Sequence, residues 1–153
     1  MTAEAERDFL RAAIELARGN VAGGGRPFGA LVVKDGAVIA TGVNEILATG
    51  DPTAHAEMGA IRAASRALGS PDLSGCAVYA SGHPCPMCMA AMRMAGITAV
   101  SFAYSNEDAA PFGLSTAAIY AELALPLAQQ RMRIRHVPVD DVAPPALYAE
   151  WRG

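Results

Sequence analysis

The chain has 153 residues, of which 52% are hydrophobic and 18% are charged, and its formal net charge at pH 7 is −3. These values predict one globular domain over residues 1–153, and the acidic balance argues against a nucleic-acid partner, which needs a basic face. No apolar run approaches the roughly 20 residues of a membrane span, and early acids argue against a signal peptide, so a cytoplasmic protein is expected.

The first part of the chain is predicted to form a helix and a hairpin. Apolar residues recur at helical spacing over residues 4–18, and Gly19-Asn20 is expected to end this helix. A glycine-rich loop over residues 19–29 follows, without the Gly-Lys-Ser/Thr ending of a phosphate-binding loop. Two β-rich runs within residues 30–44 then flank Lys34-Asp35-Gly36, which is a strong hairpin signal.

The rest of the chain alternates between helix and strand patterns. The predicted helices cover residues 56–68, 86–96, 116–123 and 145–151, and the predicted strands cover residues 76–81, 97–104 and 131–137. Strands that alternate with helices favour one sheet covered on both faces. The expected fold is therefore a three-layer α/β/α sandwich with a mixed, roughly five-stranded sheet.

Two cysteines mark the start of the predicted helix at residue 86. Cys85 directly precedes Pro86, which suits the first turn of a helix, and Cys88 follows one turn later. Both sulfurs can therefore lie on one side of the helix N-terminus, where free amides and the helix dipole favour thiolates. Taken alone, Cys-x-x-Cys also fits a redox pair or two small buried side chains.

A histidine and a glutamate add to the cysteine pair. His55 can supply a third metal ligand, which leaves one position of a tetrahedral zinc open for water, and Glu57 lies two residues on, as suits a proton carrier. Separately, the two residues also fit an ordinary helix start with a first-turn acid and a hydrogen-bonding histidine. Together, His-x-Glu followed by Pro-Cys-x-x-Cys is the signature of zinc deaminases.

This pattern resembles the cytidine deaminase superfamily, in its nucleobase-processing branch, from about Gly23 to Tyr120. The segments "RPFGALVVKDG", "DPTAHAEMGAIRAA" and "HPCPMCMAAM" are similar in order and spacing to motifs of bacterial guanine deaminases. The resemblance implies a cytidine deaminase-like fold and one Zn²⁺ per chain. The implied metal ligands are His55, Cys85 and Cys88, and Glu57 would carry protons during hydrolysis.

The resemblance also implies a substrate and its contacts. The substrate would be a free nucleobase or related aminoheterocycle, guanine-type by preference, and the chain would form a homodimer whose C-terminal tail reaches towards the neighbouring site. Asn44 would hydrogen-bond a ring carbonyl, Asp108 would hold or relay a proton, and Phe28 would wall the pocket. Ala56 and His83 complete the expected substrate contacts, and His83 stands where similar enzymes usually carry glutamate.

Other functions remain open at this point. A cytosine deaminase or a tRNA adenosine deaminase would use the same mechanism, although an enzyme acting on tRNA is expected to have a more basic surface. A non-enzyme alternative is a scaffold in which zinc only stabilises the fold. Glu57 argues against the scaffold, because structural zinc sites are usually closed by four protein ligands.

Overall fold

The computed structural model describes residues 1–139 and 146–151 of the chain. Its internal contacts divide the chain into two units, Met1–Tyr120 and Ala121–Gly153. The first unit contains the sheet and the helices that cover it, and the second contains short helical segments. A single domain over all 153 residues stays a prediction.

The first unit is built on one mixed sheet. Among the described residues the sheet has four strands in the order β2-β1-β3-β4. The strand β1 is antiparallel to both β2 and β3, whereas β3 and β4 are parallel and therefore need the crossover that helix α4 provides. The strands are β1 (Gly29–Lys34), β2 (Ala37–Val43), β3 (Cys76–Gly82) and β4 (Ala99–Tyr104).

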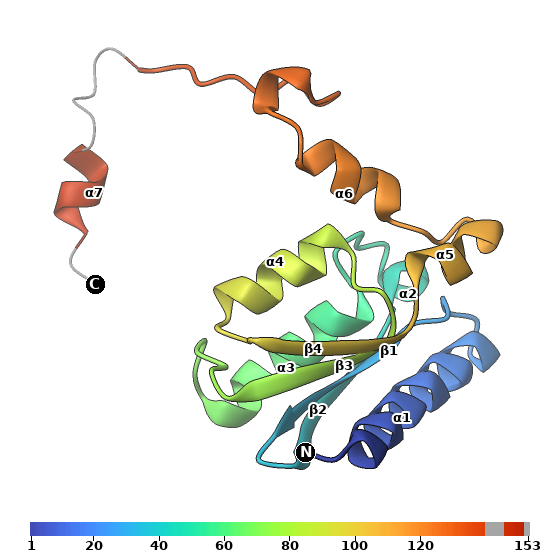
Figure 1. Ribbon diagram of the computed structural model, residues 1–153. Helices are drawn as coiled ribbons and strands as arrows, with labels where there is room; N and C mark the ends of the chain where they lie inside the picture. The colour runs from blue at the N-terminus through green and yellow to red at the C-terminus, as the bar shows by residue number, and fades with distance from the viewer. Residues whose placement is uncertain (140–145, 152–153) are drawn as a thin grey trace. The chain divides into compact units, whose positions relative to one another are not determined.

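Helices cover both faces of this sheet, as Figure 1 shows. Helix α1 (Ala3–Ala22) packs on one face, and helices α3 (Ala56–Leu68) and α4 (Pro86–Met94) pack on the other. Successive strand residues point to opposite faces, so Val32 of β1 lies in the core beneath α3 and α4, and Leu31 lies in the core beneath α1. The predicted three-layer α/β/α sandwich is confirmed.

Short helical segments connect and follow these elements. The predicted helices at residues 116–123 and 145–151 correspond to α6 and α7, although residue 145 lies outside the described residues. Over the two described ranges, no helix combines the length and the apolar character needed to cross a membrane. The segments are α2 (Ile46–Thr49), α5 (Asn106–Ala109), η1 (Ala110–Phe112), α6 (Ala117–Leu123), η2 (Leu127–Gln129) and α7 (Ala146–Glu150).

The hairpin between β1 and β2 forms where the sequence predicts it. Asp35 and Gly36 both have positive φ, 50° and 76°. Two such residues in succession are the requirement of a type I′ turn, whose twist matches that of the flanking strands. This local signal therefore sets the pairing of β1 with β2.

Helix α1 is longer than predicted. The sequence predicts an end near Gly19-Asn20, but the helix continues to Ala22 and Gly23 is its C-cap. The reason is tertiary: the side chain of Asn20 donates hydrogen bonds to the carbonyls of Arg26 and Asn44, each at 2.8 Å. Asn20 therefore holds the following loop in place and does not end the helix.

The strand predicted at residues 131–137 is wrong, and with it the fifth strand of the sheet. These residues lie outside any helix or strand. Alternation of arginines with apolar residues only makes a stable strand where a neighbour pairs with its backbone. Within residues 121–139 and 146–151 there is no such ladder.

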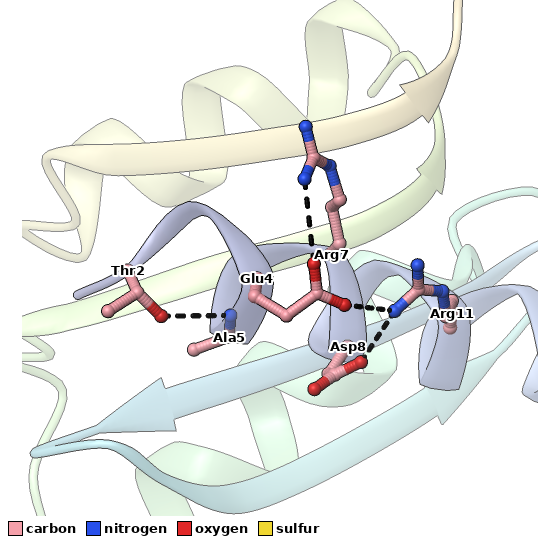
Figure 2. A network of polar contacts seen from close by, with 6 residues as sticks. All are labelled: Thr2, Glu4, Ala5, Arg7, Asp8 and Arg11. Carbon is pink, nitrogen blue, oxygen red and sulfur yellow. Dashed lines mark hydrogen bonds and ion pairs between the residues drawn. The ribbon is translucent and has the colours of Figure 1, made fainter.

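The N-terminus of α1 is held by local polar contacts, shown in Figure 2. The Thr2 side chain accepts a hydrogen bond from the Ala5 amide at 3.2 Å, as an N-cap does. Arg11 forms ion pairs with Glu4 at 2.9 Å and Asp8 at 2.7 Å. These ion pairs are solvent-exposed, so they contribute little to stability.

A close approach between β2 and α3 positions the start of α3. A Cβ added at Gly42 would lie 2.6 Å from the Ala60 amide nitrogen and closer still to the Ala56 carbonyl oxygen. Both atoms belong to the backbone, which cannot move aside as a side chain can. Only glycine at residue 42 therefore allows α3 to pack this tightly on the sheet.

Gly42→Ala is expected to destabilise the protein by about 1–3 kcal/mol, because it overpacks a contact between two backbones. Urea unfolding measures this change. Gly59→Ala is the matched control: its Cβ would meet only Gly42 at an ordinary 3.8 Å, and alanine in a helix is favoured over glycine by up to about 1 kcal/mol. Equal stability of Gly42→Ala and the parent would contradict the tight packing.

Candidate active site

Three potential metal ligands meet at the N-termini of α3 and α4. His55 is the N-cap residue of α3, Cys85 is the N-cap residue of α4, and Cys88 lies in the first turn of α4. His55 Nδ1 lies 3.3 Å from Cys85 Sγ and 3.6 Å from Cys88 Sγ, and the two sulfurs are 3.6 Å apart. These three donor atoms all lie within 4.8 Å of one another.

The spacing of the donors fits one tetrahedral ion. Zinc–sulfur bonds of about 2.3 Å and zinc–nitrogen bonds of about 2.0–2.1 Å place two sulfurs about 3.8 Å apart and a sulfur and a nitrogen about 3.5 Å apart. The observed separations of 3.3 to 3.6 Å lie close to these values. His55, Cys85 and Cys88 can therefore hold a metal ion without rearrangement of the backbone.

The electrostatics of the group favour a thiolate. The hydrogen bond between the two cysteine side chains, helped by the one from His55, lowers the pKa of Cys85 to about 4. The same cysteine pair, together with burial, raises the pKa of Cys88. The hydrogen bond with Cys85 raises the pKa of His55. Cys85 is thus readily ionised, and the thiolate is the form of cysteine that binds metals.

Glu57 lies beside the ligands without belonging to their group. Its side chain is only 5% exposed, and its Oε2 accepts a hydrogen bond from Cys88 Sγ at 3.4 Å. Burial raises the pKa of Glu57, because an isolated carboxylate is poorly solvated there. A buried carboxyl group of raised pKa can both take up and release a proton, which is the property of a general acid–base catalyst.

The structure also has a cavity of about 410 Å³, which neither the three donors nor Glu57 line. Three residues that the sequence analysis assigned to substrate binding or catalysis line it, namely Phe28, His83 and Asp108. The C-terminal half of α1 forms its apolar wall. His83 is also stacked on the Phe102 ring, with centroids 4.5 Å apart. The structure therefore brings residues 28, 83 and 108 together at one opening.

Asn44 and Ala56 are buried and do not line this cavity, and Ala56 directly follows the ligand His55 in the sequence. Asn44 is 4% exposed. Its backbone amide donates a hydrogen bond to the Phe28 carbonyl at 3.1 Å, and its side-chain Oδ1 accepts one from the Ile46 backbone amide at 3.1 Å. This leaves the Nδ2 group of Asn44 as a hydrogen-bond donor for a ligand. Ala56 is fully buried at the start of α3, between His55 and Glu57.

Asp108 has a structural task that the sequence analysis did not identify. It forms a capping box with Ser105 at the start of α5, in which Oδ2 accepts from the Ser105 amide at 2.8 Å and from its hydroxyl at 3.0 Å. One carboxylate oxygen is thus used within the loop. Only Oδ1 remains for a substrate, so a change at Asp108 also alters the wall of the cavity.

Two further residues, Tyr120 and Asn20, make contacts that the sequence pattern does not predict. The Tyr120 hydroxyl donates a hydrogen bond to the carbonyl of Pro84. The side-chain amide of Asn20 donates hydrogen bonds to the carbonyls of Arg26 and Asn44. Tyr120 and Pro84 are 36 positions apart in the sequence, and Asn20 and Asn44 are 24 positions apart. No local pattern in the sequence signals them, because each partner is a backbone carbonyl whose neighbour depends on the fold.

Taken with the fold, a buried glutamate beside a His/Cys/Cys group defines a hydrolytic deaminase of the cytidine deaminase type. Residues 3–104 match the family model described as "Cytidine and deoxycytidylate deaminase zinc-binding region", and the chain belongs to that family. The predicted superfamily and enzyme class are confirmed.

Individual members of the family show how far the similarity extends. The guanine deaminase of Bacillus subtilis (strain 168) is 42% identical over 145 residues, covering 94% of this chain and 92% of that protein. The X-ray structure of guanine deaminase from Bacillus subtilis matches with a TM-score of 0.88 at 39% identity, over 99% of this chain and 96% of that one. A tRNA-specific adenosine deaminase of Aquifex aeolicus is 31% identical, over 88% of this chain and 87% of that protein.

Proposed function

We propose that this chain is a zinc-dependent deaminase of free nucleobases or related aminoheterocycles, with a preference for guanine-type rings. The observation that carries the proposal is the convergence of His55 Nδ1 and the two cysteine sulfurs beside the buried Glu57 carboxyl. Full-length similarity to a guanine deaminase supports the choice of substrate. The net reaction consumes water, replaces the exocyclic amino group of the ring by an oxo group, and releases ammonia.

One Zn²⁺ per chain would be held by His55, Cys85 and Cys88, and zinc in such a site makes water nucleophilic near neutral pH. Glu57 then acts as the proton carrier. It accepts a proton from the attacking water at Oε2, or at the other oxygen of the same carboxylate, and passes protons to a ring nitrogen and to the departing amine. Its raised pKa suits this double task, because it must be basic in one step and acidic in the next.

The remaining residues would bind and orient the ring. Asn44 would donate from Nδ2 to a ring carbonyl, and Phe28 would contact the face of the ring. Asp108 would accept from the exocyclic amine through Oδ1, since Oδ2 is held by Ser105. His83 and Ala56 would complete the pocket. A buried polar edge without a partner is costly, so these groups favour a ring with matching donors and acceptors.

A homodimer, which rests on the resemblance to similar enzymes, and a location in the cytoplasm complete the proposal. The runner-up is a tRNA adenosine deaminase, which the similarity to the Aquifex aeolicus protein favours. The net charge of −3 argues against it, because binding to the phosphates of RNA depends on a basic surface. A cytosine deaminase would use the same catalytic group.

Ammonia release from a panel of substrates tests the proposed specificity. We expect guanine or another 2-amino-4-oxo ring, such as isocytosine or a pterin, to turn over faster than adenine and cytosine by about 10⁴-fold, since a site that hydrogen-bonds one edge rejects analogues that leave its polar groups unpaired. Faster turnover of cytosine than of every 2-amino-4-oxo ring would leave only the deaminase class. Turnover of tRNA alone would favour the runner-up, and no ammonia from any substrate would favour a zinc scaffold.

A further inference from the structure

A buried carbonyl lies directly before the ligand Cys85. Pro84 is fully buried, and its carbonyl precedes the hydrogen-bond ladder of α4, whose first bond runs from the Met89 amide to the Cys85 carbonyl at 3.0 Å. The Pro84 carbonyl instead accepts a hydrogen bond from the hydroxyl of Tyr120. Because buried backbone carbonyls need a partner, this hydroxyl satisfies a polar group at the entry to the metal-binding turn.

The same tyrosine contacts the preceding residue. Its ring centroid lies 5.3 Å from that of His83, and the backbone amide of His83 donates to the Tyr104 carbonyl of β4 at 2.8 Å. The segment from His83 to Cys85 is therefore held by β4 on one side and by Tyr120 on the other. Burial raises the pKa of Tyr120, so its hydroxyl remains a donor.

We propose that Tyr120 is a positioning residue of the metal site. By holding the Pro84 carbonyl it fixes the peptide that leads into Cys85, and so sets the place of the Cys85 sulfur relative to His55 Nδ1 and Cys88 Sγ. The inference rests on the metal site of the proposed function. Tyr120 lies outside residues 3–104, the part of the chain that matches the family model.

The physical reason is the geometry of a tetrahedral site. Cys85 is the N-cap residue with φ −70° and ψ 166°, so its backbone is extended. Its carbonyl accepts the first hydrogen bond of α4, but the Pro84–Cys85 peptide that precedes it lies outside the helix. A small rotation of the Pro84–Cys85 peptide would move the Cys85 sulfur off its 3.6 Å spacing from Cys88. Partners that hold the surroundings of metal ligands typically contribute about 10–100-fold in metal affinity or activity.

The test compares Tyr120→Phe with Tyr79→Phe. Each variant removes one phenolic hydroxyl and keeps the ring, and Tyr79 lies in the core on the α1 face, where its hydroxyl donates to Met1 Sδ at 2.9 Å. Zinc affinity is measured by competition with a chelator. The absorption of the Co²⁺-substituted protein, recorded without substrate, reports on the cobalt–thiolate geometry. Circular dichroism and thermal unfolding show that both variants fold.

We expect Tyr120→Phe to weaken zinc binding by about 10-fold and to shift the Co²⁺ absorption, whereas Tyr79→Phe leaves both unchanged. Tyr120→Phe should also lower kcat with little change in KM. Parent-like zinc affinity and cobalt spectrum in Tyr120→Phe would overturn the positioning role alone, as would equal losses in both variants. A parent protein that binds no zinc would overturn the metal site, and this inference with it.

Discussion

Glu57→Gln is expected to lower turnover by about 10⁴-fold or more while the zinc content and the fold are retained. General acid–base catalysis contributes roughly 10²–10⁴ at each proton transfer, and the proposed mechanism gives more than one transfer to Glu57. Glutamine has nearly the same size as glutamate, but its side-chain amide cannot carry a proton. Steady-state ammonia release and metal analysis of the same preparation measure the two effects.

The control for this variant is Glu15→Gln, which removes an exposed carboxylate on α1 whose partner is Arg18 at 2.9 Å. It should behave as the parent does. Loss of zinc from Glu57→Gln would make Glu57 a ligand, and parent-like turnover with zinc bound would remove it from catalysis.

Cys85→Ala and Cys88→Ala are each expected to lose zinc and activity together. The parent should contain about one zinc per chain, and removal of a ligand should weaken binding by more than the 10–100-fold that loss of an outer partner costs. Strong chelation of the parent should likewise abolish turnover. Because bound metal stabilises only the folded chain, both variants should also unfold at a lower temperature than the parent when zinc is present.

Cys76→Ala provides the matched control, since Cys76 is also a buried cysteine, only 3% exposed, but lies in the core at the start of β3. It should keep its zinc and its response to chelators. Full activity of the parent after complete removal of zinc would contradict the metal-dependent mechanism. Loss of zinc from Cys76→Ala as complete as from Cys88→Ala would mean that the metal is held differently.

Much of the fold follows from local patterns. The turn at Asp35-Gly36 has two residues that tolerate positive φ, and Pro86 starts α4 at the first helical position. The spacing of Cys85 and Cys88 is one turn of a helix, so their proximity needs only that α4 forms. These features depend on neighbours within a few residues, which is why they can be read from the sequence.

The proposed substrate-binding residues show which features the sequence does not predict. Asp108 was assigned to proton relay, and the structure also gives it a capping box with Ser105. Sequence spacing reveals which residues can share a helix end, but it does not reveal how the oxygens of one carboxylate are divided between a cap and a ligand. The roles of Asp108, Asn44 and His83 in binding therefore remain proposals.

Short-range periodicity, turn chemistry and a recognisable motif encode the α/β class, the hairpin and the identities of His55, Cys85 and Cys88 as potential ligands. Tertiary contacts set the end of α1, the absence of a fifth strand among the described residues, the meeting of His55 with the two cysteines, and the hydrogen bond from Tyr120 to Pro84. The physical reason is that each of these depends on a partner far away in the chain. A strand needs a paired neighbour and a buried carbonyl needs a donor, and the folded chain alone brings them together.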